Sequence, residues 1–159
     1  MDTKTVAISQ AGKIVGSGYV RVTSITSGKK YLIVAENGDK YAVLPASAGL
    51  NASKLFDGIA ITVANGKIEA NAANNAHAVT IVASDGAYTI QNTAGKFIEY
   101  ANNSSGKTQL AIVDASSRKW VADEETAGTF LIKDSEVTGR ALLYRNGDTE
   151  YDNRFGGYA

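Results

Sequence analysis

The sequence predicts an all-β fold built from three pseudo-repeats of about four short strands each, with almost no helix. The first indication is a run of glycine, aromatic residue and isoleucine that occurs three times, in residues 28–33, 86–90 and 128–132. In each copy the aromatic residue and the isoleucine are two positions apart, so both point to one face of a strand. A second glycine follows each copy, and apolar residues return three and five positions after it. Each copy therefore predicts a strand, a turn and a strand, and the internal repeat indicates a repeated architecture.

The copies divide the chain into three units, at about residues 19–75, 76–117 and 118–159. Tyr31 and Tyr88 are 57 positions apart, whereas Tyr88 and Phe130 are 42 positions apart, so the first unit carries 15 additional residues. Each unit opens on one more apolar pair of period two, and these pairs are Val20 and Val22, Val79 and Ile81, and Trp120 and Ala122. Together the strands predict a single domain close to a β-barrel capped by hairpins.

Turn residues separate the predicted strands. Asn65-Gly66 stands between alternating apolar residues and predicts a hairpin turn, because both turn positions need positive φ. We expect Gly95 and Gly139 to hold positive φ as well, where only glycine is unstrained. Residues 46–55 come nearest to a helical pattern and predict a loop with at most one helical turn. The third unit is short, so its last strand is either supplied by residues 3–8 or absent from this sequence.

Four segments resemble the repeat unit of the ricin-type β-trefoil, and these are residues 95–100, 118–120, 128–132 and 139–142. The likeness extends over about residues 19–159 as a pattern rather than as close identity. Residues 25–34 and 154–158 are also similar to an uncharacterised domain that is common in large secreted proteins of gut Bacteroidota. The first resemblance implies a β-trefoil fold. The second implies an accessory or adhesive role without chemistry.

The chain departs from the ricin-type pattern at the positions that mark each unit and bind sugar. That family carries Gln-x-Trp in each unit, whereas here only Trp120 is present, with Arg118, His77 and Gly18 in the glutamine positions. We expect Trp120 to be a core residue. Glu99 is the only acid where sugar-binding units of the family carry aspartate, and the aromatic residue on which the sugar stacks is missing. The resemblance therefore implies an incomplete sugar site in every unit.

Composition and charge exclude several classes of partner. Lysine plus arginine equals aspartate plus glutamate at 16 each, so no net field attracts phosphate backbones or anionic lipid, and we expect no nucleic-acid partner. No apolar run approaches the roughly 20 residues of a spanning helix, so we expect no membrane insertion. The first residues contain no apolar signal segment, which indicates either a cytoplasmic protein or a domain excised from a longer secreted chain. The resemblance favours the second alternative and an extracellular or cell-surface location.

The sequence carries no signature of catalysis or of a cofactor. With no cysteine and with His77 as the single histidine, neither a thiolate site nor a two-histidine metal site can form. Residues 123–125 are three adjacent acids and predict a solvated surface rather than a carboxylate pair for glycoside hydrolysis. Asp148, Glu150 and Asp152 alternate as calcium ligands do, but the glycine of a calcium loop is missing, and pairing with nearby arginines is the simpler interpretation. We therefore expect no enzyme and no metal.

A binding site is expected at the hairpin tips, where aromatic rings stand beside amides and carboxylates. A neutral sugar needs this combination, because its C–H face stacks on a ring while its hydroxyls take fixed hydrogen bonds. The candidate ligand-binding residues are Glu99, Asn102, Asn103, Tyr144, Asn146, Asp148, Tyr151 and Asp152. The alternative is that Tyr100 and Tyr144 are core residues with their hydroxyls at the rim, and that residues 102–106 are a turn-rich loop.

Two hypotheses for function follow from the sequence. The first is a non-catalytic carbohydrate-binding or adhesive accessory module of a larger secreted or cell-surface protein. The alternative is a structural or protein-interaction β domain with no small-molecule ligand. Both rest in part on resemblance, and a fold does not entail a function.

Overall fold

The computed structural model describes residues 2–11, 18–146 and 152–159 and shows an all-β chain. Among these residues the only helix is α1, of four residues (Ala72–Asn75). The strands are β1 (Asp2–Lys4), β2 (Val6–Ala11), β3 (Gly18–Arg21), β4 (Lys29–Asn37), β5 (Lys40–Val43), β6 (Phe56–Asp57), β7 (Ile59–Ile61), β8 (Lys67–Glu69), β9 (Val79–Ser84), β10 (Ala87–Gln91), β11 (Phe97–Tyr100), β12 (Leu110–Val113), β13 (Trp120–Thr126), β14 (Thr129–Asp134), β15 (Ala141–Asn146) and β16 (Arg154–Tyr158).

Six strands close into a barrel. The order around the ring is β2, β4, β9, β10, β13 and β14, and every neighbouring pair is antiparallel. The ring closes where β14 pairs with β2, with Thr129 opposite Ala7. β2 therefore supplies a barrel strand next to the third unit. This agrees with the first alternative for the last strand of that unit, namely that residues 3–8 contribute it.

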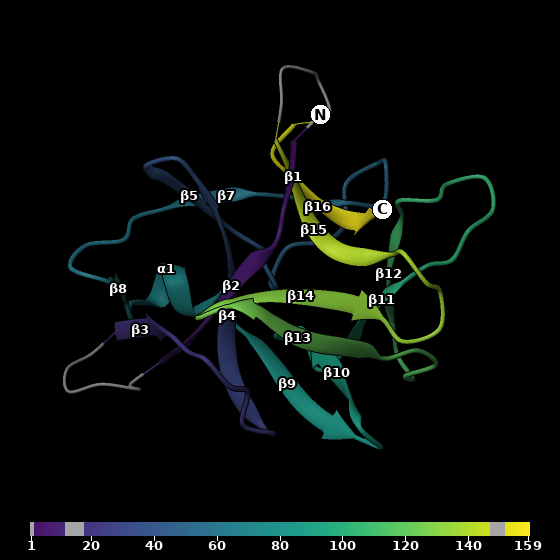
Figure 1. The fold of residues 1–159 in the computed structure, drawn as a ribbon, viewed down its shortest axis with the longest axis horizontal. Helices are drawn as coiled ribbons and strands as arrows, with labels where there is room; N and C mark the ends of the chain where they lie inside the picture. The colour runs from purple at the N-terminus through teal and green to yellow at the C-terminus, as the bar shows by residue number, and fades with distance from the viewer. Residues whose placement is uncertain (1, 12–17, 147–151) are drawn as a thin grey trace.

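The same pairing order follows three of the barrel strands. β4 pairs with β5 and β5 with β7, β10 pairs with β11 and β11 with β12, and β14 pairs with β15 and β15 with β16. In Figure 1 the pairs β5–β7 and β15–β16 lie above the barrel strands β9, β10 and β13. A three-stranded meander thus starts at each of the barrel strands β4, β10 and β14.

The barrel interior is packed by the apolar residues that the repeat predicted. Ile33, Ile90 and Ile132 are all buried, and each lies opposite a residue of the preceding strand of the ring. For Ile33 that partner is Ile8 of β2. The strand before Ile33 in the ring is β2, whereas Val20 lies on β3, which pairs with β2 and β8.

The turn predictions are confirmed by backbone geometry. Gly95 has a φ of 79° and Gly139 a φ of 86°, values that favour glycine because a side chain there would crowd the backbone. Asn65 and Gly66 have φ values of 54° and 73°, as a type I′ hairpin turn requires. Residues 46–55 form turns and loop, as predicted, and α1 lies later, at the end of the first unit.

The additional residues of the first unit build a second apolar cluster outside the barrel. Leu32 and Val34 point outward from β4, away from the residues that pack the interior, and both are buried. Tyr19 of β3 and Ile68 of β8 cover them, together with Ala78. The wall of the barrel at β4 therefore has packed apolar side chains on both faces, and the edge of this second cluster is where a groove opens.

Candidate functional site

Glu99, the first candidate residue, lies inside the protein, where its carboxylate binds backbone. Its side chain is 3% exposed. Oε2 accepts hydrogen bonds from the backbone N–H groups of Ser117 at 2.8 Å and Arg118 at 2.9 Å, and Oε1 accepts one from the Ser117 hydroxyl at 2.8 Å. These bonds tie the segment before β13 to β11.

Arg118, which stands in a glutamine position of the ricin-type pattern, is part of the same buried network. Its guanidinium forms an ion pair with Asp134 at 2.6 Å and with Glu136 at 2.7 Å. The hydrogen bond that the guanidinium donates to Asp134 raises the pKa of Arg118, and burial opposes that shift. Trp120 is 1% exposed and donates from Nε1 to the Ile98 carbonyl at 2.8 Å, so its prediction as a core residue is confirmed.

Tyr100 and Tyr144 are core residues with polar ends. Both are 4% exposed. The Tyr100 hydroxyl donates to the carbonyl of Lys107 at 2.8 Å, and the Tyr144 hydroxyl donates to Oδ1 of Asn153 at 2.7 Å. Burial raises the pKa of Tyr144. The alternative interpretation of both rings, as core with the hydroxyl at the rim, matches this geometry.

Asn102 and Asn103 are exposed and shape a turn. Asn102 has a φ of 50°, in the left-handed region that asparagine tolerates. Asn103 accepts from the backbone N–H and the hydroxyl of Ser105 and donates from Nδ2 to Oε1 of Gln109 at 3.0 Å. Most of the hydrogen-bonding capacity of Asn103 is thus occupied within its own loop.

The predicted tip is only partly covered by the described residues. Asn146 and Asp152 are half-buried, and Asp152 has partners of its own. Asp148 and Tyr151 lie outside the described residues, as does Glu150 of the calcium pattern. The part of the chain that the structure describes holds no cluster of three histidine, cysteine or acidic side chains that could bind a metal. Residues 123–125 are exposed, as predicted.

The structure shows a groove elsewhere, along the outer face of β2. It consists of two hollows of about 330 and 580 Å³, which share Ala7, Arg21 and Glu36 as lining residues. We call these the apolar half and the polar half of the groove. The remaining lining of the apolar half is Ser9, Tyr19, Val34, Tyr41, Val63, Gly66 and Ile68, and that of the polar half is Thr3, Lys4, Thr5, Gly38 and Thr129.

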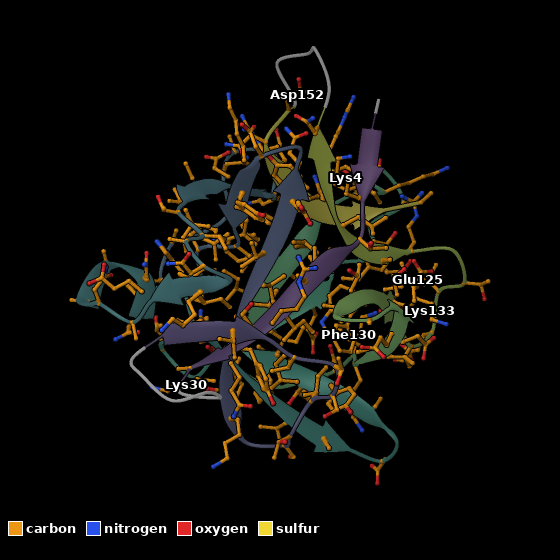
Figure 2. All side chains as sticks on the ribbon, turned by 60° about the vertical axis from the view of Figure 1, so that its left-hand side comes forward. Lys4, Lys30, Glu125, Phe130, Lys133 and Asp152 are labelled. Atoms are coloured by element: carbon orange, nitrogen blue, oxygen red, sulfur yellow. The ribbon has the colours of Figure 1, made fainter. Side chains whose placement is uncertain are left out.

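The groove exists because β2 carries small side chains on its outer face. Thr5, Ala7 and Ser9 alternate outward, while Val6 and Ile8 point into the barrel core. On one side β2 pairs with β4, and on the other it pairs with β3 and then with β14. The longer side chains of those neighbours form the walls. Figure 2 shows Lys4 at the junction of β1 and β2, with β2 running beside β4 below it.

An ion pair crosses the floor of the groove between its two halves. Nη2 of Arg21 donates to Oε2 of Glu36 at 3.3 Å, and the side chains are 44% and 51% exposed. An ion pair this exposed contributes only about 0–1 kcal/mol to stability, because water screens it. The aliphatic stem of Arg21 lies against Gly128 and leaves no room there for a side chain. The guanidinium is thus held across the groove by packing as well as by charge.

Polar groups in the apolar half are positioned by the fold. The side chain of Ser9 is 6% exposed, and its hydroxyl forms no hydrogen bond with the residues that the structure describes. The Tyr19 hydroxyl donates to Oδ1 of Asn75 on α1 at 2.6 Å, and burial raises its pKa. Tyr41 packs partly buried against the second apolar cluster. A free hydroxyl, a ring and two charged groups therefore face one hollow.

Sequence reasoning missed the groove, although one signal for it was present. Thr5-x-Ala7-x-Ser9 is an alternation of small residues next to the apolar pair Val6 and Ile8. Once this segment is read as a barrel strand, the alternation indicates a shallow outer face. The walls could not be read in this way, because Arg21 and Glu36 come from β3 and β4, two strands that meet only through their pairing with opposite edges of β2.

No family model matches this chain, and searches among curated proteins and among solved structures find no match. In the described part of the chain, no helix has the length and apolar character needed to cross a membrane.

Proposed function

We propose that this chain is a β-trefoil that serves as a non-catalytic carbohydrate-binding or adhesive accessory module of a larger secreted or cell-surface protein. The fold part of the proposal is supported by the six-stranded ring and by the meander that recurs three times. In a trefoil each unit contributes two barrel strands and a hairpin, and here the second barrel strand of the last unit would be β2.

The observation that carries the binding function is the groove along β2. It combines an aromatic side chain, Tyr41, with a hydrogen-bonding hydroxyl and a charged pair that crosses its floor. A sugar ring has an apolar face and a rim of hydroxyls, so it needs such a mixed lining. Arg21 and Glu36 offset each other's charge, and each can hydrogen-bond a hydroxyl, so the junction between the two halves suits an uncharged sugar better than a charged one.

A glycan array probed with the purified chain tests this proposal. We expect binding to neutral glycans with a dissociation constant between about millimolar and micromolar, because an open groove buries little of its ligand. Tyr41→Ala should abolish the signal, while Tyr41→Phe, which keeps the ring, should retain most of it. Glu36→Gln should weaken binding, whereas Glu125→Gln, an exposed acid on β13, serves as the matched control.

The same array distinguishes the groove from the tip that the sequence predicted. A double variant, Asp148→Ala with Tyr151→Ala, removes a carboxylate and a ring from that tip. We expect it to bind as the parent does. If the tip variant loses binding while Tyr41→Ala keeps it, the ligand lies at the tip and the assignment to the groove is wrong.

A second candidate function, a structural or protein-interaction domain, is favoured by one observation. Ile59 on β7 is 42% exposed, and it is the only large apolar side chain this exposed among the described residues. In the same residues β7 pairs with β5 alone, so its other edge is unpaired. If sedimentation shows self-association that Ile59→Lys removes, and if the array shows no binding, this second function replaces the first.

A further inference from the structure

We infer that the groove is a two-part site for a linear, uncharged oligosaccharide, and that each chain carries one such site. This inference rests on the carbohydrate-binding function proposed above and adds the form of the ligand, the part played by each half and the stoichiometry. The sequence pattern does not indicate a single site per chain, since it predicts three comparable units.

The two halves lie side by side. Ala7, Arg21 and Glu36 line both, and the ion pair between Arg21 and Glu36 lies where they meet. Their volumes of about 330 and 580 Å³ are within the range of about 300–1,000 Å³ that is typical of small-molecule sites. A ligand that fills both must therefore be extended and must cross the ion pair.

The halves offer different chemistry. The apolar half has Tyr41, Val63 and Ile68 beside the free hydroxyl of Ser9, so it fits one sugar ring that packs by its C–H face. The polar half is lined by three threonines and Lys4, which offer hydrogen bonds but no aromatic ring. We therefore assign the first sugar unit to the apolar half. The following units lie in the polar half and are held mainly through their hydroxyls.

The paired charges of Arg21 and Glu36 favour an uncharged ligand where the two halves meet. Arg21 has one polar partner among the described residues, Glu36, and the two charges cancel. A carboxylate brought to Arg21 would also come close to Glu36, and like charges repel. The hydroxyls of a neutral sugar can instead accept from the guanidinium and donate to the carboxylate.

The apolar half of the groove is walled by residues of the first unit that the sequence does not repeat in the second and third units. The residues that correspond to Val34 are Gln91 on β10 and Lys133 on β14, if the strands are aligned on the buried isoleucines of the repeat. These positions are polar, whereas Val34 is buried under the additional residues of the first unit. Val63 and Ile68, which wall the apolar half, belong to those additional residues. The threefold pattern therefore does not extend to the site.

Calorimetric titration with saccharides of increasing length tests the inference. The probes are malto-, cello-, manno- and chito-oligosaccharides of one to four units, with oligogalacturonides as the carboxylated comparison. For the series that binds, we expect affinity to rise about tenfold or more from one unit to three and then to level off. The stoichiometry should be one per chain, and sodium chloride should change the affinity little because the ligand carries no charge.

Two variants separate the halves. Ser9→Ala should lower the affinity for one unit and for three units by the same factor, because the hydroxyl belongs to the apolar half. Thr129→Val should lower the affinity for three units and leave that for one unit unchanged. Thr80→Val on β9 is the matched control, since this residue is also a half-buried threonine in a barrel strand and does not line the groove.

The outcomes distinguish this inference from the function on which it rests. If saccharides bind without a gain with length, or with three sites per chain, or more tightly when carboxylated, the inference is wrong and the carbohydrate-binding function stands. Equal effects of Thr129→Val on one and on three units would also overturn the division into halves. If none of these saccharides binds, both the function and the inference are wrong.

Discussion

Replacing Glu99 tests whether this buried acid is part of the framework or of a ligand site. In the structure its carboxylate accepts two backbone N–H groups and one hydroxyl, at 2.8 to 2.9 Å. Glu99→Ala removes both acceptor oxygens and leaves the N–H groups of Ser117 and Arg118 without a partner. Glu99→Gln keeps one acceptor for both N–H groups, and its new amide can donate to the Ser117 hydroxyl.

The two changes should therefore differ in cost. A buried N–H left without an acceptor costs about 1–3 kcal/mol. Arg118 is half-buried and Ser117 is exposed, so water can reach the released N–H of Ser117, and we expect Glu99→Ala to lower the free energy of unfolding by about 1–3 kcal/mol. Glu99→Gln should cost about 1 kcal/mol, because only the charge assistance of the hydrogen bonds is lost. Since a domain of this size is stable by about 5–15 kcal/mol, the alanine variant would lose a measurable part of its stability.

Urea unfolding followed by tryptophan fluorescence measures this difference. Trp120 is the only tryptophan and donates to the carbonyl of Ile98, the residue before Glu99, so its emission reports on this region. If Glu99→Ala unfolds within about 0.5 kcal/mol of the parent, the range of ordinary surface substitutions, the framework role of this carboxylate is refuted.

Two further predictions concern a turn and a buried tyrosine. Gly95→Val should destabilise the protein by about 1–3 kcal/mol, since the φ of 79° strains any side chain although no atom lies within 4 Å. Gly49→Val, in equally open space but without positive φ, should melt close to the parent, and equal melting of both variants would show that strain is unimportant. Burial raises the pKa of Tyr158 from 10.0 to about 12, so its contribution to stability is complete below pH 10 and is lost as the pH rises to about 12. Thermal unfolding between pH 9 and about 12 should therefore show a shallower decline in Tyr158→Phe than in the parent, and identical profiles would contradict this assignment.

The sequence was informative where a local pattern decides the structure. The positive φ of Gly95 and Gly139 follows from the chemistry of a single turn, and the burial of Trp120 follows from the repeat. Both can be predicted from a short stretch of sequence. The position of the strand that contains Val20 could not be predicted from a local pattern. Val20 alternates with Val22 as Val6 alternates with Ile8, so local periodicity cannot tell which pair enters the barrel; pairing between distant strands decides it.

The candidate site was harder to predict than the fold for the same physical reason. Tyr100 and Tyr144 stand beside amides and acids in the sequence, but burial directs their rings into the core, and their hydroxyls satisfy groups of the protein itself. Arg21 and Glu36 lie 15 positions apart with nothing in the sequence to connect them. They meet only because β2 pairs with β3 on one edge and with β4 on the other.

The closure of that ring by β2 also determines how the chain can fold. β2 and β4 are near in sequence and can pair early, but the other edge of β2 meets β14, close to the opposite end of the chain. Contacts between such distant segments are slow to form, because the entropy of closing the loop is lost before the contact is gained. During synthesis β2 leaves the ribosome before β14 and must wait for this partner. Without β14 the ring has an open edge at β2, so the barrel closes only after β14 has been made.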